Sequence, residues 1–305
     1  MRIGIDIGGT KTAAIAVSDD GTFGEVVKRA TGFGGRAVLD SAETSVRLLA
    51  ARSGLAVSTL RSIGVGIPGA VDSASGVVSH AVNLGVSELA LGAELGRRMG
   101  VPVHVENDVK AAALGAHHLT TGGAGLRTDA GSMAYLNLGT GLAAGIVQNG
   151  VLLRGVSGAA GEIGHLPVDP LGELCGCGQR GCLETVASGS AIARMWPSDA
   201  ALPAADLFER AAAGDADALA VQHTFFEGVA AGVRMLVLTV DVDRVVIGGG
   251  LSALGEPLIH GVRAVLADWS SSSPFLASLR LSDRVQLIPI GFPAAAFGAA
   301  LVGVK

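Results

Sequence analysis

The sequence is poor in aromatic residues, charged residues and cysteine. Phe, Trp and Tyr together make up 4% of the 305 residues, and Asp, Glu, Lys and Arg make up 16%. Hydrophobic residues reach 49%, and there are 46 glycines. Low charge combined with a high apolar content excludes an intrinsically disordered chain. The small side chains favour close packing of helices on sheets, and the glycines predict many tight turns.

Long basic runs and long hydrophobic runs are also missing. The net charge is −5, so nothing favours a nucleic-acid partner. The sequence contains no run of about 18 apolar residues, so we expect no membrane-spanning helix. The N-terminal segment MRIGIDIGGT is typical of a strand and a turn rather than of a signal peptide. We therefore expect a cytoplasmic protein, and a polyanion such as ATP would be bound locally, by backbone N–H groups and a metal.

Two common nucleotide-binding motifs are excluded. The pattern G-x-x-x-x-G-K-[ST] does not occur, so the chain is not a P-loop enzyme. Gly64, Gly66 and Gly69 fit G-x-G-x-x-G, but Pro68 and the turn-rich segment AVDSASG follow where a helix should begin. This context argues against a dinucleotide site.

Hydrophobic periodicity predicts alternating strands and helices. We expect a hairpin at 2–17 that turns at Gly8-Gly9, and further strands at 63–67, 101–105 and 244–247. Helices are expected at 36–53, 88–99, 109–118, 184–196, 203–213, 215–239 and 293–303, and a Cys-rich loop at 158–183. This order is typical of an α/β protein.

The layout of the N-terminal hairpin recurs near the middle of the chain. The segment AYLNLGTGLAAGIVQNG, from Ala134, resembles IGIDIGGTKTAAIAVSDDG, with Asp6 corresponding to Asn137 and Thr10 to Thr140 or Gly141. Glycine-rich hairpins also recur in α/β proteins for no special reason. Read as a true repeat, the pattern predicts two similar α/β lobes with a cleft between them.

The three cysteines and one histidine form a metal-ligand pattern. Cys175, Cys177 and Cys182 lie within eight residues and, with His165, give the spacing H-x9-C-x-C-x4-C. Three thiolates and an imidazole suit a tetrahedral structural zinc site. Three unrelated thiols beside a loop histidine are the simpler alternative. An odd number of cysteines in so short a span argues against a disulfide framework.

Acidic residues near this loop are candidate sugar ligands. Glu162 lies three residues before His165, and Glu184 follows Cys182 by two. Acids of this kind are more often solvated surface groups. Beside a loop braced by a metal, however, a carboxylate and an imidazole can hold neighbouring hydroxyls of a sugar.

A second acidic segment follows the strand expected at 101–105. Glu106-Asn107-Asp108 precedes an Ala-rich helix, which places a carboxylate at a strand end. Asp108 has two interpretations, as a helix N-cap or as the general base that deprotonates a hydroxyl during phosphoryl transfer. Asn107 would offer a donor and an acceptor to a neighbouring hydroxyl.

Three glycine-rich turns have backbones bare enough to approach a nucleotide. Asp6 in the first turn can hold Mg²⁺ through water. The third turn could let an adenosine lie flat against its backbone. The expected contacts are Asp6, Gly8, Gly9, Thr10, Lys11 and Thr12, then Gly139, Thr140 and Gly141, then Gly248, Gly249 and Gly250.

These motifs resemble the ROK family (repressors, open reading frames and sugar kinases) of the actin-like ATPase superfamily, over nearly the whole chain. DIGGTKT is similar to the family's first phosphate segment, ENDVKAAALG to its sugar segment and LGTGLAAG to its second phosphate segment. GEIGH with CGCGQRGCLE resembles its zinc signature, and VVIGGG its adenosine segment. The last two resemblances are the most specific.

The resemblance implies an actin-like (ribonuclease H-like) two-lobed fold, MgATP as phosphoryl donor and Asp108 as catalytic base. The lobes would comprise residues 1–115 with the C-terminal helix at 292–305, and residues 116–291 with the zinc loop and oligomerisation helices. A homodimer or homotetramer is implied. The sugar contacts implied are Gly69, Asn107, Asp108, Glu162, His165 and Glu184.

Two positions depart from the family pattern. Many of its sugar kinases read END-A-N where this chain has Val109-Lys110, and a common Glu is replaced by Ala116. The exact sugar therefore stays open between glucose, or a similar hexose, and an N-acylhexosamine such as N-acetylmannosamine. ATP and polyphosphate also stay open as donors.

Two other classes of protein are weaker alternatives. One is a catalytically silent sugar-binding relative, which the retention of both Asp6 and Asp108 disfavours. The other is a repressor, which would carry an added N-terminal helix-turn-helix. Because the first phosphate motif begins at residue 3, we expect none.

Overall fold

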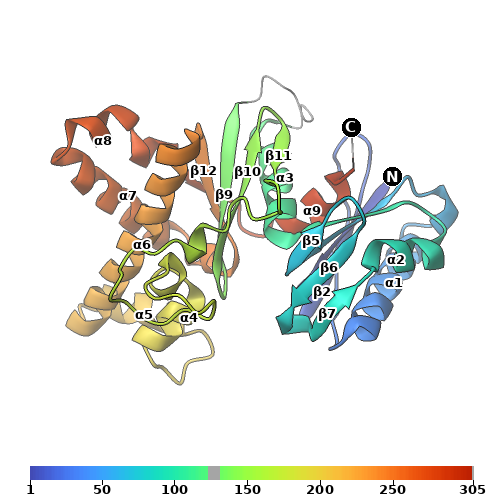
Figure 1. Cartoon of the computed structure of the whole chain (residues 1–305), viewed down its shortest axis with the longest axis horizontal. Coiled ribbons are helices and arrows are strands. Elements are labelled where there is room, and N and C mark those ends of the chain that lie inside the picture. The colour runs from blue at the N-terminus through green and yellow to red at the C-terminus, as the bar shows by residue number, and fades with distance from the viewer. Residues whose placement is uncertain (123–130, 304–305) are drawn as a thin grey trace. The chain divides into compact units, whose positions relative to one another are not determined.

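The computed structural model describes residues 1–122 and 131–303, and the chain forms two compact units (Figure 1). The first unit contains Met1–Ala130, Asn149–Ala159 and Pro293–Lys305, and the second contains Gly131–Gln148 and Ala160–Phe292. The boundary expected between residues 115 and 116 falls inside a continuous helix, α3 (Asp108–Thr120). The chain therefore passes between the units after this helix rather than within it.

The first unit is built on a five-stranded sheet with the order β3-β2-β1-β4-β8. Its strands are β1 (Arg2–Ile7), β2 (Lys11–Val17), β3 (Val27–Ala30), β4 (Ile63–Ile67) and β8 (Val103–Asn107). Strand β1 is antiparallel to β2 and parallel to β4, which is parallel to β8. Ile3, Ile5 and Ile7 are fully buried in the core, as their alternation predicts.

A smaller antiparallel sheet and several helices complete this unit. The sheet contains β5 (Ala70–Asp72), β6 (Val77–Ala81) and β7 (Val86–Leu89). The helices are α1 (Gly35–Arg52), α2 (Leu91–Met99), α3 and α9 (Ala294–Leu301), with short 3₁₀ turns η1 (Val57–Thr59) and η2 (Val82–Leu84). The helix expected at 88–99 is corrected to α2, because Glu88 and Leu89 pair with β6.

Glycines let α9 approach the sheet and α3 closely. A Cβ on Gly4 would lie 1.9 Å from the carbonyl oxygen of Ala296, and one on Gly64 would lie 1.7 Å from that of Ala299. On Gly298 it would lie 1.7 Å from the carbonyl oxygen of Ala111. Any side chain at these positions would push backbones apart. The first glycine of the G-x-G-x-x-G match therefore has a packing role.

The second unit repeats this sheet plan with the order β11-β10-β9-β12-β13. Its strands are β9 (Ser132–Leu138), β10 (Leu142–Gln148), β11 (Val151–Leu153), β12 (Arg244–Gly248) and β13 (Val285–Leu287). Strand β9 is antiparallel to β10 and parallel to β12. The strand order therefore repeats as the recurring sequence pattern suggests.

Helices surround this second sheet and enclose its core. They are α4 (Gly189–Met195), α5 (Pro203–Ala212), α6 (Ala216–Val240), α7 (Glu256–Ser271) and α8 (Pro274–Leu279), with 3₁₀ turns η3 (Ile163–His165), η4 (Leu183–Thr185), η5 (Gly250–Leu254) and η6 (Leu281–Arg284). The helix expected at 184–196 is corrected to η4 followed by α4. Ser188 starts the new helix by accepting a hydrogen bond from the Ala191 N–H.

Helix α6, with 25 residues, is the longest helix that the structure describes. By length and composition alone it could cross a membrane, yet 50% of its most apolar window is buried inside the protein. Phe225, Val229 and Val233 are fully buried in the core of the second unit. Such burial is typical of the central helix of a folded core.

Candidate functional site

The carboxyl ends of three parallel strands meet in the first unit. In the register of β1, β4 and β8, Asp6 lies opposite Gly66, and Gly66 lies opposite Glu106. A Cβ on Gly66 would lie 3.5 Å from the Cα of Asp108, so Asp108 lies directly beyond this edge. Parallel sheets bind ligands at this edge. The structure thus brings together Asp6 and Asp108, which are 102 residues apart in sequence.

The protonation of Asp6 is affected by burial and by the neighbouring Asp108. Burial, together with the negative charge of Asp108, raises the pKa of Asp6 to about 7. Two carboxylates near one another without a cation disfavour full ionisation of both. A bound divalent cation would offset this repulsion, because metal charge reverses the local pKa preference. The pair is therefore suited to a site that binds a metal-nucleotide complex.

Helix α3 begins with Asn107 as its cap. The Oδ1 atom of Asn107 accepts hydrogen bonds from the Val109 N–H at 3.1 Å and from the Lys110 N–H at 3.2 Å. Asp108 is the first residue of the helix, and its Oδ1 accepts from the Val109 N–H at 2.9 Å. The capping role that the sequence allowed for Asp108 thus belongs to Asn107.

Asn107 also contacts Gly69. Its Nδ2 donates to the Gly69 carbonyl oxygen at 3.3 Å, so these two predicted sugar ligands are neighbours. Gly69 has φ 105°, a conformation that side chains rarely adopt, and a Cβ there would lie 2.8 Å from the Ser79 carbonyl oxygen. Of the two amide hydrogens of Asn107, one is donated to Gly69, which leaves the other for a ligand.

The first predicted phosphate turn separates into exposed and buried parts. Gly9, Thr10 and Lys11 are exposed, and the Gly8 N–H closes the turn on the Lys11 carbonyl oxygen at 2.9 Å. Thr12 is fully buried, and its hydroxyl lies 3.0 Å from that of Thr31. Thr12 therefore supports the turn from inside rather than facing a ligand.

The sequence alone assigned no role to Thr31, which supports the first phosphate turn, or to Arg154, which binds Glu106. Thr31 donates its hydroxyl to the Gly8 carbonyl oxygen at 2.7 Å. The buried carboxylate of Glu106 accepts from Arg154 Nε at 2.7 Å and from Ser73 Oγ at 3.1 Å. Neither Thr31 nor Arg154 lies within a motif, so no spacing signal could have found them.

In the second unit, the turn at 138–141 lies beside Glu184. The Oε2 atom of Glu184 accepts from the Leu142 N–H at 2.9 Å, and it lies 2.3 Å from where a Cβ of Gly141 would be. The carbonyl oxygens of Gly139 and Thr140 accept from the N–H groups of Gly189 and Ser190 at 2.8 and 3.1 Å. The beginning of α4 therefore holds this turn in place.

The third glycine-rich turn packs against the second. Gly248 lies opposite Asn137 in the parallel pairing of β12 with β9. A Cβ on Gly249 would lie 2.5 Å from the Leu138 carbonyl oxygen, and the Gly249 N–H donates to the Tyr135 hydroxyl at 3.0 Å. The structure thus joins 139–141 and 248–250 at one edge of the second sheet. Tyr135, the single tyrosine of the chain, was not predicted to contribute.

The four predicted metal ligands converge. One ligand atom from each of His165, Cys175, Cys177 and Cys182 lies within 4.8 Å of the others. The Nδ1 atom of His165 lies 3.6 Å from the Cys175 sulfur, and the Cys177 and Cys182 sulfurs are 3.6 Å apart. Sulfur–sulfur separations near this value are those that tetrahedral zinc with bonds of about 2.3 Å requires. The donor set and its geometry therefore fit a structural zinc ion.

Two thiols of this cluster have pKa values shifted in opposite directions. Hydrogen bonds from the backbone and side chain of Gln179 lower the pKa of Cys177 to about 6. Burial, together with the neighbouring thiols, raises the pKa of Cys182 to about 12. Zinc binds thiolates, and its charge favours their formation.

The metal cluster fixes the direction of the His165 ring. Because Nδ1 faces the sulfur atoms, Nε2 is the ring nitrogen left for another partner. Gly164 packs beside Glu184, since a Cβ on Gly164 would lie 3.6 Å from the Glu184 Cβ. Glu162 is exposed, at the start of η3. The three predicted sugar ligands of this unit are therefore carried by two adjoining 3₁₀ turns.

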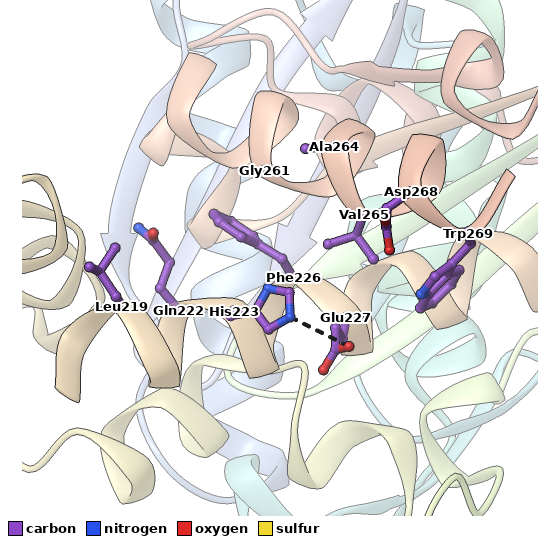
Figure 2. Close-up of a pocket in the computed structure, with 10 residues that line it drawn as sticks. All are labelled: Leu219, Gln222, His223, Phe226, Glu227, Gly261, Ala264, Val265, Asp268 and Trp269. Carbon is purple, nitrogen blue, oxygen red and sulfur yellow. Dashed lines mark ion pairs between the residues drawn. The ribbon is translucent and has the colours of Figure 1, made fainter. Parts of the chain in front are cut away.

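A separate pocket of about 390 Å³ lies between α6 and α7 (Figure 2). Figure 2 shows Phe226, Val265 and Trp269 in its wall and an ion pair of 3.6 Å between His223 and Glu227. None of the residues predicted to bind sugar, nucleotide or metal lines it. This pocket is thus distinct from the candidate site.

The family model named ROK family matches residues 2–300. The chain belongs to the ROK family. It is 34% identical over 283 residues to a glucokinase of Halalkalibacterium halodurans, a match that covers 86% of this chain and 83% of that protein. It is 33% identical to an N-acetylmannosamine kinase of Citrobacter koseri, with 87% of this chain and 88% of that protein covered.

A solved structure is similar to the whole chain. It is the ROK family glucokinase of Streptomyces griseus in complex with glucose and AMPPNP, with a TM-score of 0.79 and 30% identity over 98% of this chain and 97% of that one. The expected mixed α/β fold of ROK kinases is therefore confirmed, as is the resemblance stated from the motifs.

Proposed function

We propose that this protein is an ATP-dependent hexose kinase that phosphorylates the 6-hydroxyl of glucose or a similar hexose. The observation that carries the proposal is the pairing of Asp6 with Asp108 at the carboxyl ends of parallel strands. Such a pair supplies both halves of phosphoryl transfer, a base for the hydroxyl and a carboxylate for the metal. Glucokinases among the relatives, and a glucokinase structure with glucose and AMPPNP, support it.

Asp108 is the general base of this mechanism. Its carboxylate takes the proton of the sugar hydroxyl as the oxygen attacks the terminal phosphorus of the nucleotide. Asn107 holds the start of α3 in place and offers its remaining amide hydrogen to a neighbouring hydroxyl. Gly69 leaves room for the sugar ring beside Asn107, while Glu162, His165 and Glu184 of the second unit bind further hydroxyls.

The nucleotide is held by backbone and by Asp6. Asp6 would hold Mg²⁺ through water, and the bound ion would offset negative charge on the nucleotide's phosphates. The phosphate contacts are Gly8, Gly9, Thr10, Lys11, Gly139, Thr140 and Gly141, with Gly248, Gly249 and Gly250 against adenosine. Thr12 belongs to this set through the turn that it supports.

The metal of the Cys₃His cluster is a structural zinc. Four protein ligands fill a tetrahedral shell and leave no position for a catalytic water. Its function is to hold His165 with Nε2 directed away from the sulfur atoms. The zinc therefore affects sugar binding and takes no part in phosphoryl transfer.

An N-acylhexosamine kinase is the second candidate function. N-acetylmannosamine kinases occur among the relatives at nearly the same identity as glucokinases. The two activities differ in the group at the second carbon of the sugar. Both use Asp108 in the same way, so the choice between them concerns only substrate preference.

Assembly and location complete the proposal. We place the protein in the cytoplasm, where hexoses and ATP occur together, as a homodimer or homotetramer assembled through the second unit. Neither a nucleic acid nor a membrane is required as a partner. The net charge of −5 agrees with this.

One assay tests the function. Purified protein with MgATP should release ADP in the presence of one or a few hexoses, measured by a coupled assay over a panel that includes glucose, mannose, N-acetylmannosamine and N-acetylglucosamine. Preference for an N-acylhexosamine would select the second candidate. Absence of sugar-dependent ADP release across the panel, with ATP or polyphosphate as donor, would overturn the proposal.

A further inference from the structure

Two buried charged side chains lie on either side of the Asn107–Asp108 pair. Glu106 is 1% exposed and Lys110 is 4% exposed. Buried charges are costly unless they are hydrogen-bonded, so each needs a structural reason. Both are bonded to the same short segment, residues 154–158, which we call the strap.

Glu106 holds the beginning of the strap. Arg154 Nε donates to its Oε2 at 2.7 Å, and the Arg154 side chain is 40% exposed, whereas that of Glu106 is 2% exposed. Ser73 Oγ donates to the same oxygen at 3.1 Å, and the Asn107 N–H donates to Oε1 at 3.0 Å. The carboxylate thus links the strap directly to the residue that caps α3.

Lys110 holds the end of the strap. Its Nζ donates to the carbonyl oxygen of Gly158 at 2.5 Å. Lys110 is, with Val109, one of the two residues at which the chain departs from the pattern END-A-N. A lysine side chain reaches from the first turn of α3 to the strap backbone, and its ammonium forms a charge-assisted hydrogen bond there.

The strap leads directly to a proposed sugar ligand. The chain leaves the first unit after Ala159, and Glu162 follows Gly158 by four residues, a stretch of about 14 Å at most. On the other side of this crossing, the Ala144 N–H donates to the Gly161 carbonyl oxygen at 2.7 Å. A Cβ on Gly161 would lie 1.9 Å from the Ala144 carbonyl oxygen, so this anchor requires glycine. Little chain is therefore free between the two anchors.

We propose that Lys110 and Glu106 are positioning residues for the sugar, because they clamp the strap to the turn that carries Asp108. The clamp limits the conformations from which Glu162 can bind a hydroxyl. Neither residue touches the reacting atoms. The inference rests on the proposed function, because it assigns the strap's purpose to the same sugar site.

The decisive variant is Lys110→Met, which keeps the length of the side chain and removes the donor. We expect the KM for the preferred sugar to rise about tenfold, as loss of a charged hydrogen bond implies. The KM for ATP should stay within about twofold, since the described side-chain hydrogen bonds of the strap join it to Lys110 and Glu106 rather than to the nucleotide turns. A merely structural role would change the melting temperature and leave the two KM values in their original ratio.

Two further variants make the test secure. Arg154→Met releases the other end of the strap from a partly exposed position, so it should show the same split if Lys110→Met does not fold. Lys28→Met removes an exposed lysine of β3 in the same unit and should change neither KM. An unchanged sugar KM in a folded Lys110→Met or Arg154→Met protein would overturn the proposal, as would an equal rise in both KM values.

Hydrogen exchange separates this proposal from the proposed function. In the wild-type protein without any ligand, amides of residues 155–162 should exchange more slowly than in Lys110→Met, by about tenfold for one lost charged hydrogen bond. Equal exchange rates in the wild type and Lys110→Met would overturn the proposed clamp even if the protein is a kinase. Faster exchange in the variant, together with no sugar-dependent ADP release by the wild type, would instead support the clamp and overturn the proposed kinase function.

Discussion

The hairpin β1–β2 of the first unit and the hairpin β9–β10 of the second are built on the same plan. Each occupies the same place in its sheet, as the orders β3-β2-β1-β4-β8 and β11-β10-β9-β12-β13 show. In each, the next strand pairs in parallel with the hairpin's first strand. The turns differ, however, because Asp6 in the first corresponds to Asn137 in the second.

We expect this difference to assign different roles in the proposed reaction to the two units. The first hairpin places the carboxylate of Asp6 beside Asp108. Burial, together with the charge of Asp108, raises the pKa of Asp6 to about 7. The second hairpin carries an amide, and its turn contacts Gly249 and Glu184 through backbone and carboxylate oxygens. The same hairpin arrangement can thus carry a reactive carboxylate at one turn and ligand-binding backbone at the other.

The largest effect is expected at the base. Asp108→Asn should lower kcat roughly 10²–10⁴-fold, because an amide cannot accept the hydroxyl proton. Sugar affinity by calorimetry should change less than about threefold, since the amide keeps the shape of the side chain. A variant with most of its kcat retained would show that the chemistry does not depend on this carboxylate.

Asp6→Asn makes the first turn like the second. The change should lower kcat roughly a hundredfold, because the metal loses a negative partner while charge moves onto the phosphates. Sugar affinity should be unchanged by calorimetry. The matched control, Asn137→Asp, adds a charge to the second turn and should weaken ATP binding without changing sugar affinity. Loss of sugar binding in Asp6→Asn would remove Asp6 from the phosphate site.

The metal cluster should matter for binding more than for chemistry. Wild-type protein should contain about one zinc per chain by elemental analysis, and Cys177→Ala should lose it. Its sugar KM should rise at least about tenfold, because outer contacts of a metal site change function by this order, while the ATP KM changes less. An exposed serine outside the cluster, Ser278, provides the control substitution Ser278→Ala. Zinc-free wild-type protein with full activity would contradict the proposal.

The smallest effect concerns stability and pH. Because the pKa of Asp6 is raised from 3.8 to about 7, the folded protein binds the proton more tightly than the unfolded chain. Stability from this group therefore falls as pH rises from about 4 to about 7. Without ligands, Asp6→Asn should raise Tm at pH 8 by about 4 °C and by less at pH 5. An equal Tm difference at both pH values, measured by calorimetry, would show that Asp6 is not strained by its surroundings.

The sequence allowed the two hairpins and the metal cluster to be predicted because their signals are local. Alternation in RIGIDI defines β1, and the spacing of His165 and the cysteines defines the metal cluster. The helix at 88–99 was wrong at its beginning, because Glu88 and Leu89 pair with β6, which lies outside any local pattern. The domain limits stay a prediction, and the expected boundary cuts α3.

The remaining parts of the site depend on contacts between distant residues. Thr31 supports Gly8 across 23 positions, and Arg154 reaches Glu106 across 48. Such pairs leave no mark in a single sequence, because neither partner is unusual where it stands. The opposite holds for the glycines: Gly64 and Gly69 fit a nucleotide motif, yet one packs against α9 and the other contacts Asn107.

The position of the transferred phosphate on the sugar identifies the reaction. Wild-type protein and Asp108→Asn should be incubated with glucose and MgATP, or with the preferred sugar of the panel, and the products followed by ³¹P and ¹³C NMR. The wild type should place phosphate on the 6-oxygen, and Asp108→Asn should form almost none over the same time. Phosphate on another oxygen, or equal product from both proteins, would contradict a hexose kinase that uses Asp108 as its base.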